Sequence, residues 1–129
     1  MQVVDASVAL QACLSKSGFR PLGRREMVAP PLLWSEVTAA LHQAMWRGAI
    51  SERLAALALE RLGETRIATR RPARLYSEAW EVAQELGWAK TYDAEYVALA
   101  RLLACPLVTI DARLARSAER LVEIATPSN

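Results

Sequence analysis

The chain has 129 residues, of which 53% are hydrophobic, and its formal net charge is +2. This length fits one domain with a single core, and the apolar content excludes a disordered tail. The small net charge indicates no particular partner by itself. We therefore expect a single domain over residues 1–129.

The sequence contains no segment that would direct the chain to a membrane. No apolar run approaches the roughly 18 residues that a membrane span requires, so no membrane partner is expected. The start, "MQVVDAS", lacks the basic region of a signal peptide. Cys13 and Cys105 lie far apart in apolar segments, and we expect both to be buried, free thiols. These observations together favour a reducing cytoplasm.

Short strands alternate with helices along the chain. In chain order, we expect strands at residues 2–5, 27–29, 65–70, 106–110 and 120–125, and helices at 6–14, 30–48, 51–63, 72–87, 93–104 and 111–119. Ser51 is typical of a helix N-cap, and Gly48, Gly63 and Gly87 are expected to mark helix ends. This alternation predicts an α/β fold with three αβα layers and a short, mostly parallel central sheet.

Aspartate is rare in this chain, which has three aspartates and eleven glutamates. Asp5 ends the first predicted strand, and Asp111 ends the fourth. Asp93 begins the helix that leads into the fourth strand and, four residues before Val97, lies on the inward stripe of that helix. Glu36 lies in the first turns of the helix that follows the second strand. Because ligands bind at the carboxyl edge of parallel strands, we expect these four carboxylates to meet in one pocket.

Such a pocket suits a metal ion, because carboxylates that are close together repel one another and resist ionisation. An all-oxygen site prefers a hard cation such as Mg²⁺, or alternatively Mn²⁺. Zinc is not expected, because His42 is the single histidine and no Cys/His spacing would build a tetrahedral site. An acidic metal site at a sheet edge favours phosphodiester hydrolysis, in which the metal activates water and stabilises the leaving oxygen.

The same residues also have structural interpretations. Each aspartate precedes a helix and could be only an N-cap, and Glu36 could be a surface residue of its helix. Ser7 and Thr109, each two residues from an aspartate, could orient a metal-bound water or cap the next helix. The four tryptophans are expected first in core packing or in subunit contacts: Trp34, Trp46, Trp80 and Trp88.

Arginine supplies fourteen of the sixteen basic residues and occurs in clusters. These clusters could be an ordinary solvated surface, but guanidinium forks also suit bidentate contacts with phosphate. The candidates for contact with a nucleic-acid backbone are Arg24, Arg25, Arg70, Arg71 and Arg113.

The segments "VVDAS", "APPLLWSEV", "TYDAEYVALA" and "LVTIDARL", in this order, resemble the PIN-domain family, particularly the toxins of bacterial VapBC toxin–antitoxin systems. The resemblance implies a Mg²⁺-dependent endoribonuclease toxin with an αβα fold that forms a homodimer. It also implies tRNA or another structured RNA as the substrate, and a cognate antitoxin whose tail blocks the active site. The family's acidic quartet falls on Asp5, Glu36, Asp93 and Asp111, and its hydroxyls fall on Ser7 and Thr109.

Residues 15–27 depart from the family pattern, which usually has a fuller helical segment there. The stretch "SKSGFRPLGRRE" is interrupted by Gly18, Pro21 and Gly23. We expect the catalytic edge to survive this shortening, whereas the dimer, antitoxin and substrate contacts are the features that it could alter.

Three other functions fit parts of the sequence. A non-catalytic PIN-like module could use the acidic pocket to hold a metal or an arginine of a partner. A deoxyribonuclease could use the same pocket, because the acidic groups do not distinguish ribose from deoxyribose. A phosphoacceptor signalling domain is disfavoured, because it needs an aspartate at the end of the third strand, where "TRIATR" ends in Arg70.

Overall fold

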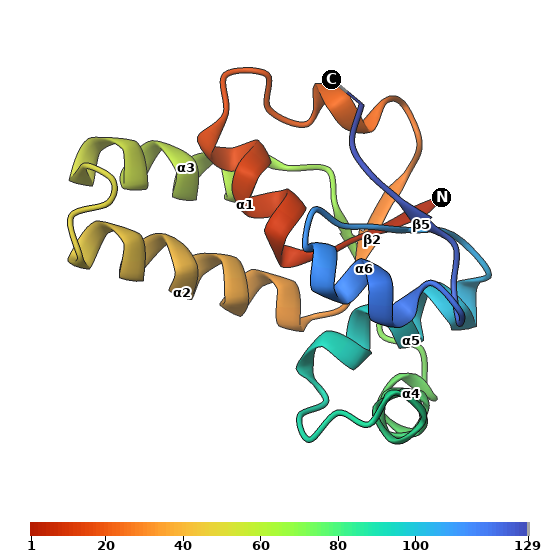
Figure 1. The fold of residues 1–129 in the computed structure, drawn as a ribbon. Helices are drawn as coiled ribbons and strands as arrows, with labels where there is room; N and C mark the ends of the chain where they lie inside the picture. The colour runs from red at the N-terminus through yellow and green to blue at the C-terminus, as the bar shows by residue number, and fades with distance from the viewer. Residues whose placement is uncertain (129) are drawn as a thin grey trace.

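Each helix and strand expected from the sequence is present in the computed structural model, which describes residues 1–128 (Figure 1). The strands are β1 (Gln2–Val4), β2 (Met27–Ala29), β3 (Ala68–Thr69), β4 (Leu107–Val108) and β5 (Ile124–Ala125). The helices are α1 (Ala6–Leu14), α2 (Leu32–Trp46), α3 (Glu52–Glu64), α4 (Leu75–Leu86), α5 (Tyr92–Leu103) and α6 (Ala112–Ala118), with a 3₁₀ helix, η1 (Arg20–Leu22).

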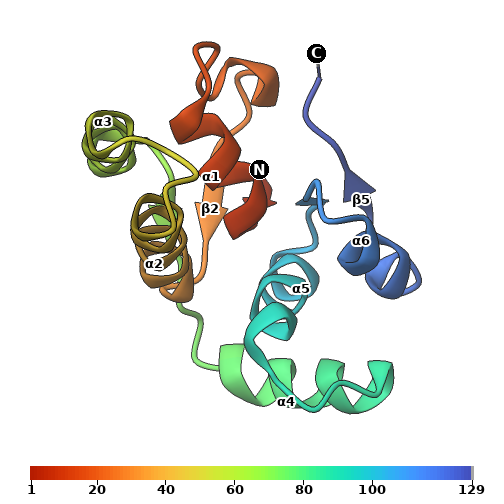
Figure 2. The ribbon, with the colours of Figure 1, turned by 60° about the vertical axis from the view of Figure 1, so that its left-hand side comes forward.

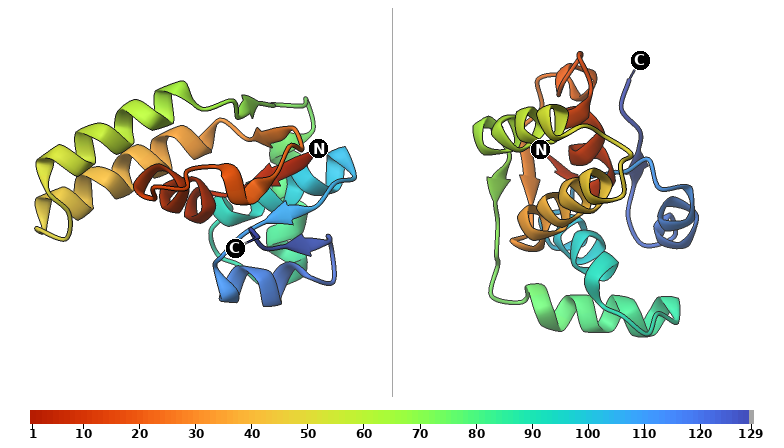
Figure 3. Two further views of the ribbon diagram at one scale, coloured as in Figure 1. Left: turned by 90° about the horizontal axis from the view of Figure 1, so that it is seen from above. Right: turned by 90° about the vertical axis from the view of Figure 1, so that its left-hand side faces the viewer.

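The five strands form one sheet in the order β3-β2-β1-β4-β5, and all four neighbouring pairs are parallel. Right-handed crossovers place α1, α2 and α3 on one face of the sheet and α5 and α6 on the other. Helix α5 contacts β1 and β4, and α4 packs on α5. Figures 2 and 3 show the strands between these two groups of helices. The prediction of a three-layer αβα fold is confirmed.

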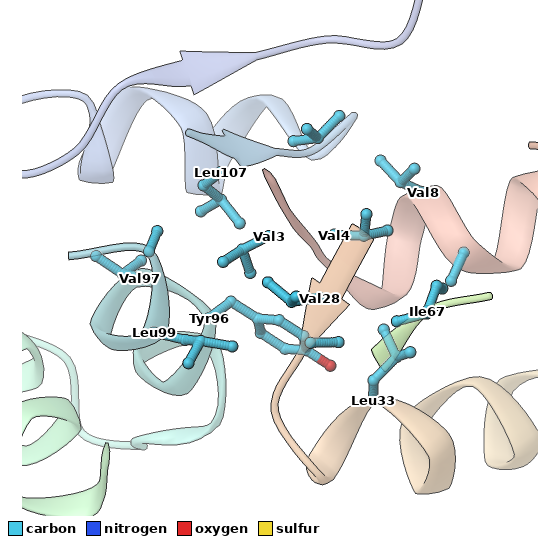
Figure 4. Packing of buried hydrophobic residues seen from close by; sticks show 14 of the residues in the cluster. Val3, Val4, Val8, Val28, Leu33, Ile67, Tyr96, Val97, Leu99 and Leu107 are labelled. Atoms are coloured by element: carbon cyan, nitrogen blue, oxygen red, sulfur yellow. The ribbon is translucent and has the colours of Figure 1, made fainter. Parts of the chain in front are cut away.

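The core is centred on the short inner strands, whose side chains are covered on both faces. Val3, Val28 and Leu107 are fully buried there. Tyr96 of α5 packs among these strand residues, and Leu33 of α2 is close to its hydroxyl end (Figure 4). Buried side chains therefore anchor α2 and α5, the two helices that carry Glu36 and Asp93.

Most of the predicted helix ends are confirmed. The Oγ of Ser51 accepts a hydrogen bond from the N–H of Leu54 (3.1 Å) and so caps α3. Gly48 and Gly87 follow α2 and α4 with φ of 78° and 71°, a backbone conformation that favours glycine. The prediction that Gly63 ends its helix is wrong, because α3 continues through it to Glu64.

Four of the five strands are shorter than predicted. The strand expected at 2–5 ends at Val4, and the strand expected at 65–70 is reduced to Ala68–Thr69. The strand expected at 106–110 is reduced to Leu107–Val108, because the N–H of Ile110 bonds to the Oγ of Ser7 and not to a neighbouring strand. The strand expected at 120–125 is reduced to Ile124–Ala125, because the N–H groups of residues 121 and 122 close the end of α6 on the carbonyl of Ala118.

The tryptophans divide into two groups. Trp34 and Trp88 are half-buried and pack against the core. Trp46 and Trp80 are 81% and 64% exposed, so the core prediction is wrong for these two and only the subunit-contact prediction is left. Their helices bury the opposite face instead, as Leu33 and Val82 show.

Residues 15–26 form η1 and the turns that flank it, and Met27 begins β2. Leu22 of η1 is buried, and its carbonyl accepts a hydrogen bond from the Nε2 of Gln2 (3.0 Å). The carbonyl of Pro21 accepts another from the N–H of Ser128 (2.9 Å). These contacts connect the shortened segment to both ends of the chain.

No helix within residues 1–128 has the length and apolar character needed to cross a bilayer.

Candidate active site

The acidic residues lie where the order of the strands reverses. After β1 the chain continues to β2 on one side, whereas β4, the other neighbour of β1, continues to β5 on the opposite side. Asp5 directly follows β1, and Thr109 and Asp111 follow β4. In parallel α/β sheets, ligands bind outside the carboxyl ends of the strands at such a switch point. The topology therefore makes this edge the candidate binding site.

Asp5 is the most deeply placed of the four acids, with only 4% of its surface exposed. Its Oδ1 accepts hydrogen bonds from the Oγ of Ser7 (2.7 Å) and the N–H of Val8 (3.1 Å). Its Oδ2 accepts one from the Oγ1 of Thr109 (2.5 Å). The N-cap interpretation of Asp5 is confirmed, since the Val8 bond caps α1. The other bonds fix the orientation of the carboxylate.

Ser7 and Thr109 connect the segments that follow β1 and β4. Their hydroxyl oxygens lie 3.4 Å apart. The Oγ of Ser7 accepts from the N–H of Ile110 (3.3 Å), and the Oγ1 of Thr109 accepts from the N–H of Asp111 (3.0 Å). The idea that these hydroxyls cap the next helices is wrong, because the caps are Asp5 and Asp111. Orientation of a metal-bound water is still a prediction.

Glu36 lies in the second turn of α2 and is half-buried. The hydroxyl of Tyr96 donates a hydrogen bond to its Oε1 at 2.5 Å, which joins helices from opposite faces of the sheet. Tyr96 is only 1% exposed, so its ring cannot easily move away. Glu36 is therefore a positioned carboxylate and not a free surface side chain.

Asp93 and Asp111 complete the group at its exposed side. Asp111 caps α6, with its Oδ1 accepting from the N–H groups of Arg113 (3.0 Å) and Leu114 (3.1 Å). Asp93 is not an N-cap, because Thr91 occupies that position. Asp93 is exposed in the first turn of α5 and is not buried with Val97, but it lines the same hollow as Glu36 and Asp111.

Three of the acids line one hollow of about 530 Å³. Glu36, Asp93 and Asp111 contribute carboxylates to its wall, whereas the buried Asp5 does not line it. The remaining lining residues come from the turn before α5 and from the start of α5 and α6: Gly87, Trp88, Ala89, Lys90, Tyr92, Arg113 and Leu114.

The acids are close enough to affect one another's ionisation. Burial is the largest cause that raises the pKa of Asp5, and Asp111 adds to it against the hydrogen bonds from Ser7 and Thr109. Burial also raises the pKa of Glu36, with repulsion from Asp93 and Asp5 opposing the Tyr96 bond. The pKa of Asp93 is raised by burial and then by Asp111. The neighbouring carboxylates therefore contribute to the raised pKa values, as expected for acids that lie close to one another.

The geometry supplies ligands for a cation but no closed cage. Within residues 1–128, no three Asp, Glu, His or Cys side chains are spaced so that they could hold a metal ion as they stand. The donors are carboxylate and hydroxyl oxygens, which suit a hard divalent cation. A divalent cation offsets the repulsion between neighbouring carboxylates. The donor set fits Mg²⁺ or Mn²⁺, with Glu36, Asp93 and Asp111 lining the hollow and Asp5 buried at the end of β1.

The basic residues are divided between the two edges of the sheet. Arg113 lines the hollow, and Arg70 directly follows β3, at the same edge as the acids. Arg71 is exposed and lies over the ring of Tyr76, 5.0 Å from its centroid. Residues 24–25 precede β2 and therefore lie at the opposite edge. Their position speaks against Arg24 and Arg25 as guides into this site.

Sequence reasoning missed several residues of the site. Trp88, Lys90 and Tyr92 line the hollow, and Tyr96 holds Glu36. Glu95 of α5 is buried, and burial and Glu36 raise its pKa. The available signal was the position of Tyr96, one helical turn after Asp93, which places its polar end near the same edge. The positions of the others depend on how α4, α5 and α6 pack.

A profile of the PIN domain matches residues 3–120, so the chain belongs to the PIN-domain family. The VapC ribonuclease Mb0985 of Mycobacterium bovis is 40% identical over 118 residues, which cover 88% of this chain and 88% of that protein. Ribonuclease VapC1 of Mycobacterium tuberculosis is 38% identical over 120 residues, covering 88% and 87%. The predicted VapC-like character is confirmed.

Two solved structures share the fold. The crystal structure of PAE2754 from Pyrobaculum aerophilum superposes with a TM-score of 0.71 at 27% identity and covers 95% of this chain and 89% of that one. The structure of FitAB bound to the IR36 DNA fragment has a TM-score of 0.66 and covers 98% and 95%. At 11% identity, this second likeness supports the fold alone.

Proposed function

We propose that this chain is a metal-dependent endoribonuclease toxin that hydrolyses RNA phosphodiester bonds at the acidic hollow. The observation that carries the proposal is that Glu36, Asp93 and Asp111 line one hollow at the switch point of the sheet. Asp5, buried at the end of β1, lies near enough to Glu36 and Asp111 for the charges to affect one another's pKa. Membership of the PIN-domain family and the similarity to VapC ribonucleases support it.

Each residue of the site has a role in this proposal. Asp5, Glu36 and Asp93 would hold a Mg²⁺ ion, for which Mn²⁺ could substitute, and Asp111 would complete the site. When bound, the ion would activate a water and neutralise the charge that develops on the phosphate. Ser7 and Thr109 keep Asp5 in position, and Tyr96 does the same for Glu36. Arg113 attracts the RNA backbone.

The partners are part of the same proposal. The likeness to VapBC toxins supports a cognate antitoxin that covers the hollow, a homodimer, and tRNA or another structured RNA as the substrate. Trp46 and Trp80, exposed on α2 and α4, are candidates for burial in such protein contacts.

Mapping the cut sites on total cellular RNA tests the activity. We expect discrete cuts with Mg²⁺ or Mn²⁺ and none after chelation by EDTA. Metal binding without RNA cleavage would contradict the proposal and favour a non-catalytic module. Faster cleavage of DNA than of RNA of the same sequence would instead identify a deoxyribonuclease.

The Tyr96–Glu36 bond gives a separate prediction. Tyr96→Phe removes only the hydroxyl, and we expect Mn²⁺ to bind about 10–100-fold more weakly, the usual effect of losing a group that orients a metal ligand. The free energy of unfolding should change by only about 1 kcal/mol. Calorimetric titration with Mn²⁺ and denaturation by urea measure the two effects. Tyr76→Phe, an exposed tyrosine on α4, is the matched control; equal Mn²⁺ affinity in both variants would rule out the positioning role.

A further inference from the structure

A fifth carboxylate lies beside the acidic group and is buried without a partner. Glu95 is in the first turn of α5, two residues after Asp93, and only 8% of its surface is exposed. Within residues 1–128, the glutamate carboxylates that accept hydrogen bonds or form ion pairs are those of Glu36, Glu78 and Glu85. Glutamate is almost never buried this far unless it is paired. The isolation of Glu95 therefore needs a physical reason.

Glu95 lies close to the proposed metal ligands but outside the hollow. Successive side chains point about 100° apart around a helix, so Asp93 and Glu95 lie on the two flanks of Tyr96. The hydroxyl of Tyr96 holds Glu36 at this turn. Glu36 in turn adds to burial in raising the pKa of Glu95, as expected for two carboxylates that repel each other. Glu95 is not among the residues that line the hollow, so it can act on an ion there through its charge but not as a ligand.

We propose that Glu95 increases the affinity of the acidic hollow for a divalent cation through its negative charge and, by the same charge, destabilises the metal-free protein. The inference rests on the metal-dependent function proposed above and adds to it a residue that is neither a ligand nor a catalytic group. Without a cation, the unpaired charge is buried beside the like charge of Glu36, which is unfavourable. A cation held by Glu36 attracts both carboxylates and offsets their repulsion.

A purely structural role for Glu95 would leave a different pattern. If its carboxylate only supported the packing of α5, its loss would lower the stability of the protein both with and without metal. The electrostatic role instead predicts opposite changes, which are a weaker affinity for metal and a more stable metal-free fold. Glutamine has nearly the size and shape of glutamate, so Glu95→Gln removes the charge without opening a cavity.

The test combines calorimetric titration with Mn²⁺ and thermal melts without metal, at pH 7.5, on the wild type, Glu95→Gln and Glu95→Asp. We expect Glu95→Gln to bind Mn²⁺ about tenfold more weakly, the order of effect of one unit charge on a divalent ion several ångströms away. Its metal-free Tm should rise by roughly 3–5 °C, because the unpaired charge is gone. Glu95→Asp keeps the charge and should bind Mn²⁺ within about threefold of the wild type. Glu81→Gln, which changes an exposed glutamate of α4, is the matched control and should change neither quantity.

The possible outcomes separate this inference from the proposed function. Unchanged Mn²⁺ affinity in Glu95→Gln, or a metal-free Tm that falls together with the affinity, would overturn the role of Glu95 and leave the proposed function intact. Equal losses of affinity in Glu95→Asp and Glu95→Gln would also overturn it, because the charge would then not be the cause. Mn²⁺ binding by a wild type that cleaves no RNA would overturn the ribonuclease proposal alone. A wild type that binds no Mn²⁺ would overturn both.

Discussion

Replacing Asp93 with asparagine is expected to lower the rate of RNA cleavage by more than about 100-fold. Loss of a residue that only orients a metal ligand lowers activity by up to about 100-fold, and Asp93 is proposed to be a ligand itself. Asparagine has nearly the same shape but lacks the charge that a hard cation requires. The side chain is exposed in the first turn of α5, so the free energy of unfolding should change by about 1 kcal/mol or less. Cleavage of labelled RNA with excess Mg²⁺ and a urea melt measure the two effects.

Asp5→Asn should also strongly lower the rate of RNA cleavage, because it removes a charge and disturbs the hydrogen bonds that orient this side chain. Asparagine can still cap α1, but its amide cannot accept hydrogen bonds from Ser7 and Thr109 at both positions. We expect a folded, somewhat less stable and inactive protein. Glu60→Gln, an exposed residue of α3, is the charge-matched control and should cleave normally. Mg²⁺-dependent cleavage at the wild-type rate by Asp93→Asn or Asp5→Asn would remove that residue from the mechanism.

The second large effect is a pH-dependent stabilisation by Mg²⁺. The pKa values of Asp5, Glu36 and Asp93 are all raised in the folded protein, chiefly by burial. The folded state therefore holds these protons more tightly than the unfolded chain. Their contribution to stability is complete below their unfolded pKa values of about 4 and is lost as the pH rises through the raised values. Without metal, these three groups make the fold less stable at pH 7.5 than at pH 4.

Mg²⁺ should reverse this loss, because it binds the ionised carboxylates of the folded state. At free concentrations 10 to 100 times its Kd, we expect a gain of about 1.4–2.7 kcal/mol at pH 7.5, or several degrees in Tm. The gain should disappear near pH 4, where protons compete for the same oxygens. Thermal melts over this pH range, with NaCl of equal ionic strength as the control, measure it. A Tm shift that is independent of pH, or that NaCl reproduces, would argue against a shared metal site.

The sequence was sufficient to predict the architecture and three features of the site. Alternating strand and helix patterns gave the parallel αβα arrangement, and the strand ends placed Asp5 and Asp111 at one edge. Glu36 followed from its position early in α2. These predictions succeeded because the carboxyl edge of a parallel sheet depends on chain direction alone, and not on details of packing.

Other features required the tertiary structure. The Tyr96–Glu36 bond joins residues 60 positions apart on opposite faces of the sheet, and helical periodicity cannot reveal such a pair. Asp93 is exposed although most of α5 is buried, and the part of the hollow formed by Trp88 and Tyr92 depends on the turn after α4. The clustering of arginines in the sequence did not show that Arg24 lies at the opposite edge of the sheet from the acids. A cluster of charges does not by itself determine at which edge of the sheet its residues lie.

The central claim is that Asp5, Glu36, Asp93 and Asp111 share one divalent cation. Anomalous diffraction from crystals of the protein soaked in Mn²⁺ tests it most directly, because the signal locates the metal independently of any assay. We predict a peak among the carboxylates of these four residues, bound directly or through water, that is lost in Asp93→Asn. A Mn²⁺ peak elsewhere on the protein, or none in crystals of a chain that still cleaves RNA, would contradict the account.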